Sequence, residues 1–450
     1  MSLSTVAEVL KAPLIGEDVV FAGVSTDTRS LQAQELFVAL KGENYDGHNF
    51  LAAATGAGAV GAIVSRSVTT TLPHIMTEDT RLALGDLAAF WRQQFTMPVI
   101  AVTGSNGKTT VKEMIAAAMN ETAAGLVTQG NLNNDIGVPL TLLRLRQTDN
   151  YAVVEMGMNH RGEIYYLTML TRPSIAVITN ASEAHLEGLG SVEEIALAKG
   201  EVYAGLPPDG IAVINADDVY AGLWRELAEN RKCLTFGLKN KADVRGEYEL
   251  TATGSLVHLN TTQGDIDMRL RLLGKHNVMN ALAATTASLA AGAGLVDIKK
   301  GLEKLRAVSG RLEVKTGISG ARILDDTYNA NPASVAVGLE VLREVFGERV
   351  LVLGDMAELG EAAAGIHQRI GALAKRVGVN RLFALGELSQ YAVKSFGKGG
   401  RHFASHQALI EELMDCMHTD MTILVKGSRI MHMERVVQGI LPRDQVGGEN

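Results

Sequence analysis

The segment that decides the fold is Val99-Ile100-Ala101-Val102-Thr103-Gly104-Ser105-Asn106-Gly107-Lys108-Thr109-Thr110. Its first four residues are apolar and predict a buried strand, and the glycine-rich turn after them leads into a helix. Backbone N–H groups of such a turn, together with the positive end of the helix, bind phosphate. We therefore predict that a nucleoside triphosphate binds at Gly104, Ser105, Asn106, Gly107, Lys108, Thr109 and Thr110.

The side chains of this loop favour the same interpretation. Lys108 is placed to reach the β and γ phosphates, and the Thr109 hydroxyl to bind Mg²⁺. The general pattern has a glycine five residues before Gly107, where this chain has Val102, so the match is to a shorter variant. The alternative is an ordinary glycine-rich turn, but such a turn does not require a lysine followed by two hydroxyl residues.

A second glycine-rich segment, residues 56–61, matches the dinucleotide-binding pattern G-x-G-x-x-G. In that pattern a strand precedes the glycines and a helix follows. Here the order is reversed, because a predicted helix precedes them and a predicted strand follows. We interpret the segment as a helix-to-strand turn.

Composition indicates a folded, globular protein. Of 450 residues, 46% are hydrophobic and 20% are charged, so the length suggests about three domains and disorder is not expected. A net charge of −8 argues against a nucleic-acid partner. Cys233 and Cys416 suggest no disulfide, and we find neither a signal-peptide pattern nor an integral membrane segment. We expect a cytoplasmic enzyme.

Strands and helices alternate along most of the chain, as is typical of parallel sheets covered by helices. After a mixed α/β region we predict strands at 99–102, 151–155, 175–180 and 211–215, with helices at 108–120 and 192–204. A strand-like stretch at 242–273 and a helix at 277–292 follow. The pattern restarts with strands at 321–324, 349–353, 381–385 and 421–425.

The predicted fold class is therefore α/β with three domains. Residues 1–82 form a small mixed α/β domain, residues 83–310 a central P-loop ATPase-type domain with a parallel sheet, and residues 311–450 a C-terminal Rossmann-like domain. Two nucleotide-type domains that face each other suggest a cleft that closes over substrates.

Polar residues follow the predicted strands of the central domain, at the edge where ligands bind in such sheets. Glu155 ends one strand, so its carboxylate can reach a Mg²⁺ ion held by Thr109. Asn180 and His185 follow the next strand, and the position of His185 favours a metal ligand over an ordinary packing residue. Lys199 lies on a helix, where its side chain is expected to be solvated.

Further candidates lie later in the chain. Asn277 and Asn280 share one face of a helix start, where one of them can instead cap the helix. Arg311 precedes the third domain and is placed to meet the γ-phosphate when the domains close. Asp326 follows a strand, a position from which a carboxylate binds ribose hydroxyls.

In order and spacing, these motifs resemble the ATP-dependent Mur amide ligases of peptidoglycan synthesis. The resemblance covers nearly the whole chain and adds Ala184-His185-Leu186-Glu187, His276-Asn277 and Gly310-Arg311 to the residues above. It implies that ATP phosphorylates a peptide carboxylate and that an amine attacks the acyl phosphate. The catalytic residues that it implies are Lys108, Glu155, His185, Lys199 and Arg311, and the further ATP contacts are Asn277, Asn280, Arg311, Asp326 and Tyr328.

The resemblance also implies two Mg²⁺ ions. Thr109 and Glu155 are expected at the ion that bridges the ATP phosphates, and Glu155 and His185 at the second ion. Lys199 matches a lysine that this family carbamylates with CO₂. Carbamylation converts a cation into a carboxylate-like metal ligand, and we state this role of Lys199 as a hypothesis.

Two regions distinguish the members of the family. Three segments near the start of the chain resemble the uridine-diphosphate-sugar domain of the two late ligases. They are Ser25 to Arg29, Leu36 to Gly42 and Asp46 to His48. Residues 131–137, 353–360 and 426–429 resemble the last ligase, and the Asp-Asn-Pro-Arg stretch of the tripeptide-forming ligase is missing. The substrate-binding residues implied are Ser25, Thr26, Arg29, Lys41, Gly42, Asp46, His48, Asn131, Asn133, Asn134, Asp135, Asp355, Glu358, Lys426, Ser428 and Arg429.

The expected partners are thus UDP-N-acetylmuramoyl-tripeptide and D-alanyl-D-alanine, bound by a monomer. The sequence leaves open whether the third peptide residue is meso-diaminopimelate or lysine.

Three other functions fit the sequence less well. Folylpolyglutamate synthase shares the loop and the chemistry but lacks a front domain of this kind. Residues 240–243 match the guanine-reading motif N-K-x-D of GTPases, yet no Asp between the loop and this motif has a glycine three residues on. A catalytically inactive binding protein would not need the positively charged residues Lys108 and Arg311, which this chain retains, so we do not favour this function.

Overall fold

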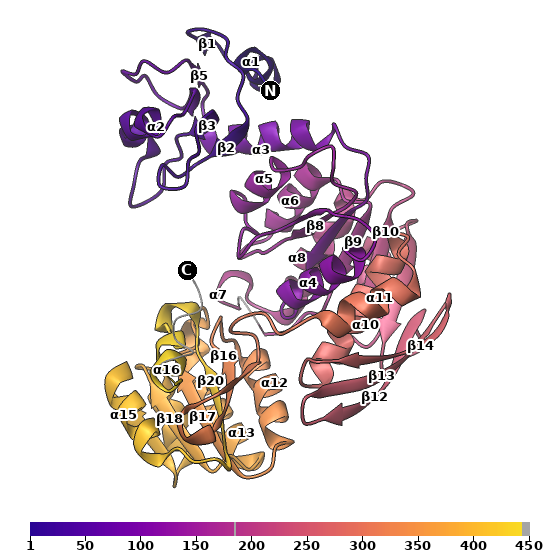
Figure 1. Ribbon diagram of the computed structural model, residues 1–450, viewed down its shortest axis with the longest axis vertical. Helices are drawn as coiled ribbons and strands as arrows, with labels where there is room; N and C mark the ends of the chain where they lie inside the picture. The colour runs from indigo at the N-terminus through magenta and orange to yellow at the C-terminus, as the bar shows by residue number, and fades with distance from the viewer. Residues whose placement is uncertain (184–185, 443–450) are drawn as a thin grey trace.

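The computed structural model describes residues 1–183 and 186–442, and Figure 1 shows three α/β units in series. We call them the first, central and third units, after their sheets within residues 14–76, 99–270 and 313–426. Each sheet has helices on its faces. In the part of the chain that is described, no helix is both long and apolar enough to cross a membrane, and both cysteines are free.

The central unit is built on a nine-stranded sheet with the order β14-β13-β12-β11-β10-β9-β6-β8-β7. In this spatial order, each strand between β7 and β12 runs parallel to its neighbours. Strand β13 runs antiparallel to both of its neighbours, β12 and β14. The strands are β6 Val99–Thr103, β7 Leu126–Val127, β8 Ala152–Glu155, β9 Ile175–Ile178, β10 Ile211–Asn215, β11 Lys232–Gly237, β12 Val244–Thr251, β13 Gly254–Thr261 and β14 Gly264–Leu270. The carboxyl ends of β6, β8 and β9 therefore meet at one edge.

Helices cover both faces of this sheet because successive strand residues point to opposite faces. Ile100 and Val102 share one core with the helices α4 Lys108–Met119, α10 Lys275–Ala290 and α11 Leu295–Lys304. Val99 and Ala101 share the other core with the helices α5 Gly137–Leu142, α6 Glu163–Thr171, α8 Val192–Gly200 and α9 Ala221–Leu227. The short helices α7 Leu186–Leu189 and η2 Glu201–Gly205 flank α8.

The first unit has a five-stranded sheet, parallel except for β1. Its elements are α1 Leu3–Leu10, β1 Leu14–Ile15, β2 Gly23–Ser25, β3 Glu35–Val38, η1 Gly47–Phe50, α2 Leu51–Gly56, β4 Gly61–Val64, β5 His74–Met76 and α3 Thr80–Arg92. Helix α2 ends at Gly56 and β4 begins at Gly61, so the prediction of a helix-to-strand turn is confirmed. Helix α3 packs against α1 and also against α5 and α6 of the central unit.

The third unit has a six-stranded sheet in the order β15-β16-β20-β17-β18-β19, in which only β15 runs antiparallel. Its strands are β15 Glu313–Thr316, β16 Arg322–Asp326, β17 Glu348–Gly354, β18 Arg381–Leu385, β19 Gly400–Phe403 and β20 Met421–Lys426. Its helices are η3 Ile318–Gly320, α12 Pro332–Arg343, η4 Gly360–Ala362, α13 Ala363–Arg376, α14 Ser389–Phe396, α15 His406–Cys416, η5 Arg429–Met431 and α16 Glu434–Gly439.

The predicted α/β class with three units is confirmed by these sheets. The sequence patterns did not predict β1, β2, β5, β7, β11, β15 and β19, most of which are short or lie at sheet edges. The expected domain boundary after residue 82 falls inside α3, which packs on both neighbouring units, and both boundaries stay predictions.

Candidate functional site

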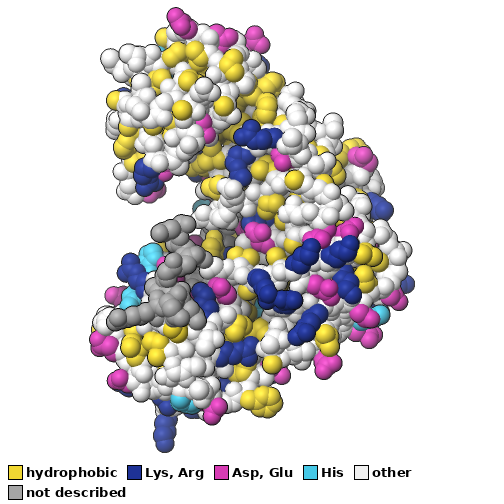
Figure 2. All heavy atoms as spheres, in the orientation of Figure 1, with side chains coloured by type: hydrophobic (Ala, Val, Ile, Leu, Met, Phe, Trp, Pro, Cys, Tyr) yellow, Lys and Arg dark blue, Asp and Glu magenta, His cyan; other side chains and the backbone are white. Residues whose placement is uncertain are grey.

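A cavity of about 2130 Å³ lies at the carboxyl edge of the central sheet, between the central and third units and beside α3. Figure 2 shows this side of the molecule as a deep notch between the first and third units. The predicted site residues that line the cavity are Ser105, Asn106, Gly107, Lys108, Thr109, Thr110, Asn131, Asn133, Asn134, Asp135, Glu155, Asn277, Asn280, Arg311, Asp326, Tyr328, Glu358, Lys426, Ser428 and Arg429.

The phosphate loop requires its two glycines. Gly107 has φ of +83°, and a Cβ there would lie 2.5 Å from Asn280 Oδ1. Gly104 has φ of +151°, and a Cβ there would lie 1.8 Å from Thr179 Oγ1. Any larger residue would therefore strain the backbone and collide with its neighbours. Gly104 does not line the cavity, so its role is to let the loop pack against the end of β9.

The loop is braced by β9 and by the third unit. Asn180 accepts hydrogen bonds from the backbone N–H of Ser105, at its carbonyl (2.9 Å), and of Asn106, at its side chain (3.1 Å). The Asn106 amide donates to Ser182 Oγ (2.9 Å) and accepts from the Asn331 amide of the third unit (3.0 Å). The Asn106 side chain thus joins two units rather than pointing freely at a ligand.

Lys108 lies at the start of α4, where its Nζ donates to Gly104 O at 2.7 Å. Burial lowers the pKa of Lys108, and nearby Arg311 lowers it further, while Glu155 acts in the opposite direction. An anion bound here would favour the charged form of Lys108, because its negative charge would offset the positive charges of Lys108 and Arg311.

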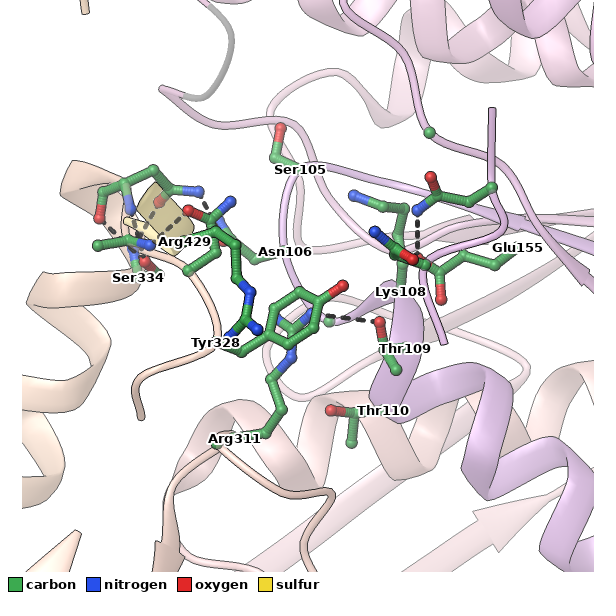
Figure 3. Close-up of a pocket in the computed structure, with 18 of the residues that line it drawn as sticks. Ser105, Asn106, Lys108, Thr109, Thr110, Glu155, Arg311, Tyr328, Ser334 and Arg429 are labelled. Carbon is green, nitrogen blue, oxygen red and sulfur yellow. Dashed lines mark hydrogen bonds between the residues drawn. The ribbon is translucent and has the colours of Figure 1, made fainter. Parts of the chain in front are cut away.

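Arg311 reaches the loop from the third unit. Its Nη2 donates to Thr109 Oγ1 (3.3 Å), and its guanidinium lies 4.0 Å from the centre of the Tyr328 ring. Figure 3 shows Arg311 and Tyr328 beside Thr109. Its buried Nε has no hydrogen-bond partner among residues 1–183 and 186–442. Arg311 therefore retains a donor for an anionic ligand.

Glu155 is the buried carboxylate of the site, with 2% of its surface exposed. Its Oε1 accepts from Asn133 Nδ2 at 2.8 Å, whereas its buried Oε2 has no hydrogen-bond partner in the described residues. A buried, unpartnered carboxylate oxygen is costly unless a cation or a donor meets it. Glu155 Oε2 and the Thr109 hydroxyl are oxygen ligands of the kind that Mg²⁺ prefers, so these residues fit that ion.

Lys199 is not solvated, and that expectation is wrong. Its side chain is 1% exposed in α8, and no residue in the described ranges forms a hydrogen bond or ion pair with it. Burial, with Lys108 as a second cause, holds the pKa of Lys199 well below its usual value. The described residues contain no cluster of three or more His, Cys, Asp or Glu side chains that would hold a metal, and His185 lies outside the described residues.

On the third unit, Asp326 and Lys426 pair with each other at 2.6 Å. Burial raises the pKa of Asp326 and lowers that of Lys426. His276 faces the same cavity, and burial together with Lys426 lowers its pKa to about 4, so the imidazole is neutral. Both predicted asparagines lie inside α10 rather than at its cap: Asn277 donates to Leu273 O and Asn280 donates to Asn277.

Several predicted substrate residues do not line this cavity. In the first unit, Ser25 ends β2 and His48 lies in η1, and the segments between elements contain Thr26, Arg29, Lys41, Gly42 and Asp46. Both His48 ring nitrogens are engaged: Nδ1 bonds Asp46 (2.5 Å), and Nε2 accepts from the Ser65 N–H (2.9 Å). Asp355 likewise accepts from the N–H groups of Leu388 and Ser389. His48 and Asp355 therefore hold loops in place.

The N-K-x-D segment is a structural loop. The Asp243 carboxylate accepts from the N–H and hydroxyl of Thr235, and the Asn240 amide donates to Ala216 O. These side chains are not available to read a guanine base, which is consistent with a chance match.

Sequence reasoning missed two residues that organise the cavity. Lys112 is 1% exposed and donates to Thr128 O at 2.7 Å, and Asn331 caps α12 while bonding to Asn106. Lys112 lies one helical turn after Lys108, so its helical spacing was the available signal. Nothing in the sequence around Asn331 indicated a contact across 225 positions.

Two family models match the chain: the Mur ligase middle domain at residues 102–288 and the Mur ligase, glutamate ligase domain at residues 310–429. The UDP-N-acetylmuramoyl-tripeptide--D-alanyl-D-alanine ligase of Escherichia coli (strain K12) is 45% identical over 98% of both chains.

Two solved structures are similar. One is UDP-N-acetylmuramoylalanyl-D-glutamyl-2,6-diaminopimelate--D-alanyl-D-alanyl ligase from Acinetobacter baumannii, with a TM-score of 0.87, 36% identity and coverage of 96% of both chains. The other is MurF ligase from Thermotoga maritima in complex with ADP, with a TM-score of 0.83, 25% identity and coverage of 93% of this chain and 96% of that one.

Proposed function

The chain belongs to the Mur ligase family, and from this premise we propose that it ligates D-alanyl-D-alanine to UDP-N-acetylmuramoyl-tripeptide, with ATP converted to ADP and phosphate. The observation that carries the proposal is the phosphate loop, with Lys108 and Arg311 beside it and the unpartnered carboxylate oxygen of Glu155 in the same cavity. This set suits transfer of a phosphoryl group between two anions.

The reaction needs activation because a carboxylate is a poor acyl donor. A carboxylate oxygen of the peptide attacks the γ-phosphorus of ATP, the bond to the β-phosphate oxygen breaks, and ADP leaves. The free amine of D-alanyl-D-alanine then attacks the carbonyl carbon of the acyl phosphate, loses a proton and expels phosphate. Lys108 and Arg311 offset the repulsion between the two anions in the first step.

Mg²⁺ is the proposed metal, held by Thr109 and Glu155. When bound, it supplies positive charge that stabilises the transferring phosphoryl group. Asn133 keeps the Glu155 carboxylate oriented, since it donates to Oε1 and leaves Oε2 directed to the cavity. His185 remains the proposed ligand of a second ion, by resemblance alone.

The remaining assignments follow the division of the chain. We assign the uridine-diphosphate end of the muramoyl substrate to the first unit, ATP to the central unit, and D-alanyl-D-alanine to the third unit. The domain boundaries proposed for these units are those predicted from the sequence, after residues 82 and 310. The third peptide residue is proposed to be 2,6-diaminopimelate, which the Acinetobacter baumannii protein carries in its name. The chain is proposed to act as a monomer in the cytoplasm, and described residues of one chain line the cavity.

The test supplies the purified chain with ATP, Mg²⁺, UDP-muramoyl-tripeptide and D-alanyl-D-alanine. Phosphate release and the mass of the pentapeptide product are measured together, and both should depend on all four components. Equal turnover with folate and glutamate would instead favour a folylpolyglutamate synthase, and no phosphate release with either set would contradict the proposal.

Lys199 is proposed to be carbamylated. Because burial and the nearby Lys108 lower the pKa of Lys199, they favour the neutral amine, which is the form that reacts with CO₂, and the resulting anion would face Lys108 in place of a like charge. We expect Lys199→Ala to lower kcat about 100-fold, with partial rescue by acetate. In ¹³CO₂-treated protein, NMR should show a carbamate signal that is missing from the variant.

Arg92 provides the matched control, since it is also a buried cation but donates to the carbonyls of Thr171, Phe95 and Arg172. A carbamate signal that persists in Lys199→Ala, or full activity of this variant without acetate, would contradict the role of Lys199. Arg92→Lys should keep the signal.

A further inference from the structure

One ion pair in the cavity has no part in the chemistry described above. Arg81 of α3 donates from Nη2 to Asp135 Oδ1 at 2.7 Å, and its Nε pairs with Asp135 Oδ2. Both side chains line the cavity, with 52% of Arg81 and 32% of Asp135 exposed. Such a bidentate pair is rigid, yet here it faces open space.

The pair retains hydrogen-bonding capacity on both partners. A guanidinium has five N–H donors and a carboxylate about four acceptor positions. The described residues give Arg81 and Asp135 no other side-chain hydrogen bond or ion pair than the one between them, although Asp79 and Tyr166 also act on Arg81 electrostatically. A ligand group that carries both a carboxylate and an ammonium can therefore bind to both ends of the pair without breaking it.

The other charged groups in this part of the cavity also have partners, but the contacts named here do not join any two of them as a two-contact pair of opposite charges. Asp79 caps α3 by accepting from the N–H groups of Arg81 and Leu82. Glu163 accepts from the Asn159 N–H, and Arg161 pairs with Glu194 at 3.1 Å. Arg81 and Asp135 are thus the groups placed to discriminate a charged ligand here.

The pair also lies at a suitable distance from the reacting carboxylate. Asn133 donates to Glu155, whose charge acts on Lys108 of the phosphate loop, and Asp135 is two residues further along the chain than Asn133. Two residues span at most about 7 Å between Cα atoms. A side chain with three methylene groups covers a similar distance, so the far end of the third peptide residue can reach Asp135 while its own carboxylate lies at the phosphate loop.

We infer that Arg81 and Asp135 recognise the zwitterionic end of the diaminopimelate side chain and make this chain prefer it to lysine. The carboxylate of that end accepts from Arg81, and its ammonium donates to Asp135. A lysine side chain has only the ammonium, which Asp135 attracts and Arg81 repels. Arg81 is therefore a specificity-determining residue, an inference that rests on the proposed function.

The experiment compares UDP-muramoyl-tripeptides that end in diaminopimelate or lysine. For the wild-type chain we expect kcat/KM to be at least about 10-fold higher with diaminopimelate, since charge-assisted hydrogen bonds are lost with lysine. Arg81→Met should remove this ratio by raising KM for the diaminopimelate substrate with little change in kcat, because the contact is the same in ground and transition states.

Control variants separate recognition from folding. Arg161→Met removes another cavity arginine and should keep the substrate ratio. Asp135→Asn should weaken both substrates while diaminopimelate stays preferred, and Arg81→Lys should give an intermediate ratio. ADP binding, measured by calorimetry, should be the same in all variants that fold.

The outcomes distinguish the two proposals. Failure of the wild-type chain to turn over either tripeptide contradicts the proposed function. Turnover of both with equal kcat/KM, a preference for lysine, or an unchanged ratio in Arg81→Met or Arg81→Lys overturns the inference while the ligase activity stands.

Discussion

Replacing Lys108 by methionine is expected to lower kcat of the ligation by about 10⁴-fold, because a cation that stabilises a transferring phosphoryl group contributes on this scale. Methionine keeps an unbranched, apolar stem in a place where burial already lowers the lysine pKa, so the fold should persist. Phosphate release measures the activity, and calorimetry with ADP measures how much binding remains.

Lys112→Met is the matched control, with the same substitution one helical turn later on α4. Lys112 donates to Thr128 O and pairs with Glu113, so its loss should affect stability more than kcat. If Lys108→Met kept more than a tenth of the wild-type activity, or if Lys112→Met were equally inactive, Lys108 would not have the assigned role.

Glu155→Gln is expected to lower kcat by about 10³-fold, because the metal-binding charge is removed, which is worth several kcal/mol of barrier. Glutamine has the same shape, and its oxygen can still accept from Asn133, so the cavity should be preserved. Removal of Mg²⁺ from the wild-type chain with a chelator should abolish turnover. Mn²⁺ binding, followed by electron paramagnetic resonance in the presence of ADP, should weaken in the variant.

Glu113→Gln tests whether any cavity carboxylate gives this result. Glu113 lines the same cavity but pairs with Lys112 at 2.8 Å, so we expect a change in kcat of less than about 3-fold for a residue that has no assigned role in the reaction. Unchanged Mn²⁺ binding in Glu155→Gln would contradict the proposed metal site.

The parts of the fold that could be predicted are those with strong local patterns. The strand before Gly104, the turn and α4 form one continuous signal, and the structure has them at Val99–Thr103 and Lys108–Met119. By contrast, β7 is two residues long, and β15 has the alternating pattern of a half-exposed edge. Such segments become strands through their neighbours, which no local window contains.

The site divides in the same way. The positions of Lys108, Thr109 and Glu155 near the ends of predicted strands indicated that these residues share one site. In the structure all three line one cavity. Burial could not be predicted for Lys199, because a lysine on a helix is usually solvated and only tertiary packing covers this one. For the same reason the local hydrogen bonds of His48 and Asp355 were not foreseen.

Two buried polar atoms of opposite charge, Glu155 Oε2 and Arg311 Nε, have no hydrogen-bond partner in the described chain. Nucleotide and metal that satisfy both atoms would stabilise the native state by mass action. A cell starved of energy would thus hold more of this protein in partly opened forms. Proteolytic degradation would then rise as the ATP concentration falls, so the lifetime of the protein would depend on the concentration of its own substrate.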